Sequence, residues 1–261
     1  MRLSDWQALF KMLKYLYIYN LFFMKLFKIF KNIQNSESNN NYSFAISKSD
    51  RDEFCSTIIN SSSLQPGFYF LLAISAFITS VGLIRDSVIL LVGGMLVAPM
   101  LSPVLAISLS LTILNIKVLI RSILIFIIST LSSLLVTVFI GVISDYNLLS
   151  INFIQIMNIF SPATLLVPIA AGAAASFAWA KKNVIGALPG AAVTVTLLPP
   201  IAAMGLALAN QSYNIFIDSL YIYILNVVGI IIGGLLVFIL MGFYKSHKKV
   251  VKEVEEESKE Q

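Results

Sequence analysis

Residues 88–114 read VILLVGGMLVAPMLSPVLAISLSLTIL, a continuous apolar run without a charged residue. A helix needs about 20 predominantly apolar residues to cross the hydrocarbon core of a bilayer, so this run is long enough. It also carries Gly93, Gly94, Pro99 and Pro103, residue types that disfavour a regular helix interior. The run therefore predicts a membrane span that is interrupted.

Five further apolar runs flank this one, at about 67–84, 119–143, 162–180, 184–209 and 219–243. The sequence is 58% hydrophobic and 12% charged, with a mean hydropathy of +0.87. A soluble domain of 261 residues cannot bury that much apolar surface. We predict an all-α integral membrane protein with six transmembrane helices. The expected parts are a basic aromatic interfacial helix (1–33), a polar linker (34–66), membrane repeat one (67–143), an external loop (144–161), membrane repeat two (162–243) and a charged cytoplasmic tail (244–261).

The charges between the spans predict the orientation. One side would hold the N-terminal segment, Lys117 with Arg121, Lys181 with Lys182 and the lysines after Tyr244; the other would hold Arg85 with Asp86, Asp145 and Asp218. Basic loops favour the cytoplasm, so we expect a multi-pass protein of the cell (inner) membrane with both termini cytoplasmic. The same rule explains the net charge of +5, so we do not expect the protein to bind nucleic acid.

The segment 6–33 is aromatic and basic. At about 100° per residue, Lys11, Lys14, Lys25 and Lys28 share one helix face, as in helices that lie on anionic lipid headgroups. A signal peptide is an alternative, but lysines would break its apolar core. A short seventh span is another alternative, although the apolar run between Lys14 and Lys25 is far below span length.

An internal repeat relates the two halves at an offset of 96 positions. At this offset Gly94 meets Gly190, Pro103 meets Pro199, and the turn at Arg85 falls on Lys181. Each unit would hold three spans, so the second unit enters the membrane from the opposite side. This is the inverted-topology repeat of many secondary transporters.

The prolines predict where the backbone loses hydrogen bonds. In helical register, Pro103 would free the carbonyl of Pro99, while Pro199 and Pro200 would free those of Val195 and Thr196. Such groups cannot face lipid, so the broken stretches should be buried or line a polar pathway between the second and fifth spans. The candidate pathway residues are Gly93, Gly94, Pro99, Ser102, Pro103, Pro189, Gly190, Thr194, Thr196, Pro199 and Pro200. The alternative is a pair of packing kinks, with the carbonyls satisfied by nearby Ser and Thr.

The sequence offers few residues for metal binding or catalysis. Cys55 is the only cysteine and His247 the only histidine, so we expect no metal site, no cofactor and no enzymatic activity. The polar groups expected at depth are Ser80, Ser102, Thr194, Thr196 and Asn226, which suit a neutral solute or a weakly held ion. For Gly172, Gly233 and Gly234 we expect a role in close helix packing.

The stretches GGMLVAPMLSPVLAISLSL and ALPGAAVTVTLLPPIAAMGLALA resemble the uncharacterised hydrophobic domain family of bacteria and archaea, domain of unknown function 389. The family's two motifs fall on Gly93 to Pro103 and on Pro189 to Pro200, with Gly94 where Ala is usual and Met100-Leu101 in reversed order. Ile159 and Leu166 stand near places where members often carry a charged pair. The resemblance implies a polytopic membrane protein and no particular activity.

Two functions remain open. The leading hypothesis is a small-solute or ion transporter with its pathway between spans two and five. The alternative is a membrane scaffold or regulatory subunit that recruits partners through its N-terminal segment and tail. The expected partners are the lipid bilayer and its anionic headgroups, and association into a homo-oligomer is left open.

Overall fold

The computed structural model describes residues 54–55, 57–58, 65–144, 162–180 and 188–246, with the backbone alone for 162–165, 188–196 and 245–246. The chain divides between Ala45 and Ile46, and all described residues belong to the second unit. The predictions for Lys11, Lys14, Lys25 and Lys28, for the loop 145–161 and for the tail 247–261 lie outside the described residues.

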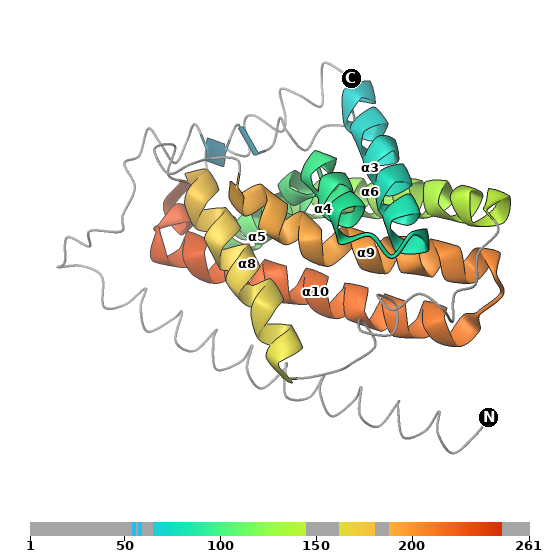
Figure 1. The fold of residues 1–261 in the computed structure, drawn as a ribbon. Coiled ribbons are helices and arrows are strands. Elements are labelled where there is room, and N and C mark those ends of the chain that lie inside the picture. The colour runs from blue at the N-terminus through green and yellow to red at the C-terminus, as the bar shows by residue number, and fades with distance from the viewer. Residues whose placement is uncertain (1–53, 56, 59–64, 145–161, 181–187, 247–261) are drawn as a thin grey trace, which may run out of the picture. The chain divides into compact units, whose positions relative to one another are not determined.

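The described part is helical. The helices are α3 (Pro66–Ile84), α4 (Val88–Val97), α5 (Leu101–Ile113), α6 (Ile116–Ile143), α8 (Pro162–Ala180), α9 (Leu188–Ala209), α10 (Tyr213–Leu240) and a short 3-10 helix η2 (Phe243–Ser246). α8 packs along α10, α6 along α9, and α3 against α4. Figure 1 shows α6, α9 and α10 running lengthwise together while α8 crosses α10 obliquely.

Positive φ angles and a side-chain cap mark the turns that follow α3 and α5. Asp86 takes a positive φ of 49° between α3 and α4, and Leu114 takes 58° at the end of α5. Asn115 then caps α6, because its side-chain oxygen accepts hydrogen bonds from the backbone N–H groups of Lys117 (3.0 Å) and Val118 (3.2 Å). These turns lie where the charged residues had predicted the breaks between spans.

Three helices, α3, α6 and α10, are long and apolar enough to cross a membrane. α4 and α5 together would make a fourth span, bent by 56°. The apolar stretches Leu166–Ala180 and Leu197–Ala209, within α8 and α9, are shorter. Over the residues that it describes, the structure thus supports a helical membrane protein with three or four candidate spans, and the count of six stays a prediction.

The last helix begins earlier than the sequence had indicated. α10 starts at Tyr213 rather than at Ser219, so Asp218 lies inside the helix and not in the loop before it. Asp218 is on an exposed face. Because 28 residues span about 42 Å, α10 is longer than the hydrocarbon core and can carry a charge near its end.

One buried cluster reaches into the segment that had been predicted as a polar linker. Phe54, Cys55 and Ile58 are at most 4% exposed. The ring of Phe54 contacts those of Phe238 (5.4 Å between centroids) and Phe243 (5.0 Å). The chain just before α3 is thereby packed on the end of α10 and on η2.

Candidate functional site

The predicted interruption in the second span exists, and Pro99 explains its position. α4 ends at Val97 and α5 begins at Leu101. Ala98, the residue before Pro99, is extended with ψ of 126°, as the proline ring requires of its predecessor. The prediction that Pro103 causes the break is wrong. Pro103 is the third residue of α5, where a helix has no acceptor for its N–H.

Side-chain hydroxyls satisfy carbonyls on both sides of the break. Ser75 of α3 donates to the carbonyl of Gly94 in the last turn of α4, at 2.6 Å. Ser102 donates to the carbonyl of Pro99 at 3.2 Å. Both serines are buried, so protein groups compensate the lost helix bonds here.

The two glycines before the break differ in their surroundings. A Cβ on Gly94 would lie 2.9 Å from the backbone N of Thr79 and 3.0 Å from the carbonyl oxygen of Ser75. A Cβ on Gly93 would have no atom within 4 Å. Gly94 is therefore required for the close approach of α3 and α4, and Gly93 is not.

The fifth expected span is not interrupted as predicted. α9 is assigned as one helix through Pro199 and Pro200, and both prolines are buried. A helix interior tolerates proline when neighbouring protein surrounds the freed carbonyls, which fits this burial. Pro189, Gly190, Thr194 and Thr196 lie in the same helix, and their side chains are outside the described residues.

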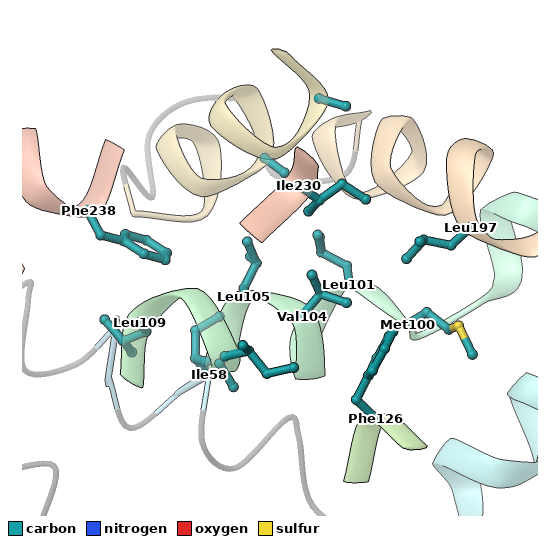
Figure 2. Packing of buried hydrophobic residues seen from close by; sticks show 14 of the residues in the cluster. Ile58, Met100, Leu101, Val104, Leu105, Leu109, Phe126, Leu197, Ile230 and Phe238 are labelled. Carbon is teal, nitrogen blue, oxygen red and sulfur yellow. The ribbon is translucent and has the colours of Figure 1, made fainter. Parts of the chain in front are cut away.

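The break and α9 do come together, through apolar side chains. Met95 and Ala98 share a buried cluster with Leu198 and Ala202 of α9. On the other side of the break, Met100 and Leu101 share a larger cluster with Leu197 and Ile201. Figure 2 shows Leu197 of α9 near Leu101 and Met100. These clusters join hydrophobic side chains of the break to hydrophobic side chains of α9, and the polar pathway between the second and fifth spans stays a prediction.

Most buried hydroxyls on α3, α5 and α6 are bonded within their own helices. Each donates to a backbone carbonyl three or four residues earlier, at 2.7–3.1 Å: Thr79, Ser80, Ser108, Ser110, Thr112, Ser122, Ser129 and Thr137. The half-buried Thr130 donates in the same way, at 2.9 Å. This back-bonding satisfies the hydroxyl without a ligand. Three buried serines, Ser133, Ser176 and Ser219, have a hydroxyl without a hydrogen-bond partner among the described groups.

A polar contact between distant helices was not predicted. The hydroxyl of Tyr223 in α10 lies 2.6 Å from Oγ1 of Thr130 in α6, and the rings of Tyr223 and Phe126 stack with an interplanar angle of 8°. No signal in the sequence links these residues; in the structure, Phe126 and Tyr223 are each the eleventh residue of a 28-residue helix.

The packing role predicted for three glycines is confirmed. A Cβ on Gly172 of α8 would lie 2.7 Å from Cα of Ile230, and one on Gly233 of α10 would lie 2.8 Å from the backbone N of Ala173. A Cβ on Gly234 would lie 2.9 Å from the hydroxyls of both Ser108 and Ser176. Small residues thus let α8 and α10 approach closely, as in membrane helix pairs.

These helices, with their apolar outer faces and small-residue contacts, define a helical protein of the membrane class. The family model Domain of unknown function (DUF389) matches residues 95–232, more than half of the chain, and the chain belongs to this family. The chain is also similar to an uncharacterised protein of Methanocaldococcus jannaschii, at 25% identity over 204 residues. That match covers 76% of this chain and 62% of the relative, so the chain spans less than two thirds of the relative's length. No solved structure matches the chain.

Proposed function

We propose that the protein transports a small solute or ion across the cell (inner) membrane, along a pathway between the broken helix α4–α5 and α9. The observation that carries the proposal is the 56° bend between α4 and α5. α4 has 10 residues and rises about 15 Å, which is roughly half of a hydrocarbon core. A helix broken at that depth, inside the protein, is the usual setting of a transport site.

Helix lengths support the inverted repeat on which the proposal relies. α3 begins at Pro66 and the described part of α8 begins at Pro162, 96 positions later. α6 and α10 both hold 28 residues, and their first residues, Ile116 and Tyr213, are 97 apart. With three spans in each repeat, the second would be inverted and both termini would be cytoplasmic.

Burial supports the same correspondence. Leu101–Ser110 of α5 and Leu197–Leu206 of α9 are buried at every position, and they also lie 96 positions apart. A helix that is apolar and buried all round lies in the interior of the protein. The two equivalent segments would then form the centre around which the outer helices move. The unpartnered hydroxyls of Ser133, Ser176 and Ser219 offer polar contacts to a solute or water within this interior.

A scaffold without transport activity is the second candidate, and a specific observation favours it. Met95, Ala98, Leu197 and Leu198 close the contact between the break and α9 with apolar side chains, and Ser75 and Ser102 satisfy carbonyls beside it. A permanent packing kink needs nothing more. The absence of catalytic carboxylates among the deep residues of the sequence leaves enzymatic activity outside the proposal.

Flux in liposomes tests the proposal. Purified protein would be reconstituted and assayed against a panel of neutral solutes, anions and cations, with empty liposomes as the baseline. Pro99→Ala should change the flux, because alanine removes the constraint on Ala98 that holds the break open. Pro103→Ala is the matched control and should leave it unchanged, since Pro103 fits the first turn of α5. Absence of flux for every solute, with folded protein, would favour the scaffold.

A further inference from the structure

The contact between Thr130 and Tyr223 is a directed chain of hydrogen bonds. The Thr130 hydroxyl donates to the carbonyl oxygen of Phe126 at 2.9 Å. Its single proton is then used, so the phenol of Tyr223 must be the donor in the 2.6 Å contact with Thr130. The chain runs from α10 to α6, across 93 positions of sequence.

The same two helices also meet through their aromatic rings. Phe126 and Tyr223 stack with centroids 6.2 Å apart, and they are only 8% and 6% exposed. Each is the eleventh residue of a helix of 28 residues. Both lie in the middle part of their helices, near the expected centre of the bilayer.

This aromatic pair adjoins the break between α4 and α5. Met100, the residue that precedes α5, is 0% exposed and belongs to the same buried cluster as Phe126 and Tyr223. Figure 2 shows Phe126 of α6 next to Met100. Phe126 of α6 therefore lies beside the side chain at the break, and its ring is stacked on that of Tyr223 from α10.

We propose that Phe126 and Tyr223 form a gate that closes the interior beside the break, and that the Tyr223–Thr130 hydrogen bond is its latch. The inference rests on the proposed function, because it names what closes the proposed pathway. To open the gate, the stacked rings must separate and the phenol must leave Thr130. Loss of the latch therefore shifts the population toward the open form.

Thiol labelling at the break tests the latch without reference to any solute. Met100→Cys would be made in a Cys55→Ala background and treated with a small charged methanethiosulfonate reagent in proteoliposomes. Adding Tyr223→Phe, which removes only the hydroxyl, should raise the labelling rate about threefold to fivefold. That factor corresponds to an interhelical hydrogen bond of about 0.6–1 kcal/mol. Thr130→Val should have the same effect from the other side of the bond.

Two controls separate a gate from a purely structural clasp. The double variant Tyr223→Phe with Thr130→Val should label no faster than either single variant, because both remove one interaction. Ile239→Cys probes a buried site, 8% exposed, near the C-terminal end of α10 and sixteen residues after Tyr223. Its labelling should not change when the latch is removed.

The outcomes distinguish the two proposals. An unchanged rate at position 100 in both latch variants, or an equal rise at position 239, would overturn the gate, since the second result means general loosening. If only position 100 labels faster but no solute crosses in any variant, the gate stands and the transport proposal fails. If flux rises together with labelling at position 100, both are supported.

Discussion

The hydrogen bond from Ser75 to Gly94 can be tested by a single atom change. Ser75→Ala removes the hydroxyl that donates to the Gly94 carbonyl at 2.6 Å. This carbonyl lies in the last turn of α4, where the helix supplies no further N–H. Ser75 is 0% exposed, so water has no access to replace the donor. An unsatisfied buried acceptor costs about 1–3 kcal/mol, while measured interhelical bonds in membranes reach at most about 1.7. We expect a loss of about 1–2 kcal/mol in the free energy of unfolding.

Ser80→Ala is the matched control on the same helix. Ser80 is also 0% exposed, and its hydroxyl donates to the Ala76 carbonyl at 2.8 Å. Ala76 lies inside α3, so its carbonyl keeps the regular bond from the helix backbone when the hydroxyl is gone. The expected loss is below about 0.5 kcal/mol, because back-bonding of this kind adds little to helix stability.

Reversible unfolding in mixed detergent micelles, followed by circular dichroism, would measure both variants against the unmodified protein. A difference of about 1 kcal/mol between them corresponds to roughly a fivefold difference in the unfolding equilibrium. If the two alanine variants are equally stable, the Gly94 carbonyl does not depend on Ser75. The explanation of how the break is compensated would then be wrong.

Three further outcomes are expected. Gly93→Ala should be neutral or stabilising by up to about 1 kcal/mol, whereas Gly94→Ala should destabilise, as thermal unfolding in detergent would show; the reverse order would contradict the packing described for α3 and α4. A reporter fused at Ser150 should read external and one at Lys181 cytoplasmic, and a cytoplasmic reading at Ser150 would exclude both six spans and the inverted repeat. A peptide of residues 6–33 should bind anionic vesicles more weakly as salt rises, each lysine contributing about 1 kcal/mol, and equal binding to neutral vesicles would refute the electrostatic contribution.

The sequence predicted the helix bounds well where charges mark the turns. The first run was placed at 67–84 and the helix is Pro66–Ile84. The fourth was placed at 162–180, and the described part of that helix is Pro162–Ala180. Arg85 and Asp86 end the first of these, because charged side chains favour the bilayer surface. The sixth was less well placed, since one exposed acidic residue, Asp218, does not end a helix.

The effect of each proline could not be predicted from residue type alone. A proline between helices fixes its predecessor, as Pro99 does, while Pro103 in a first turn costs nothing. Pro199 lies inside a continuous helix. Which of these applies depends on where the helices begin, and the uniform hydrophobicity of residues 88–114 gives no marker for that.

The hydrogen-bond partners of the buried hydroxyls could not be predicted from the sequence either. A buried serine can donate to its own helix, as Ser80 does, or to another, as Ser75 does, and both occur on α3. The Thr130–Tyr223 bond joins residues 93 positions apart, and neither has a local pattern that names the other. The stacking of Phe126 on Tyr223 is likewise known only from the structure.

The packing of Phe54 against Phe238 and Phe243 decides where a shortened protein can begin. A truncated protein designed from hydropathy alone would start at Pro66, the first residue of α3. Such a truncation would remove Phe54 and Ile58, and each fully buried side chain of this size contributes about 1.5–3 kcal/mol. It would also leave the rings at the end of α10 uncovered at the membrane surface, where they would promote aggregation. The minimal unit for expression must therefore begin at or before Phe54.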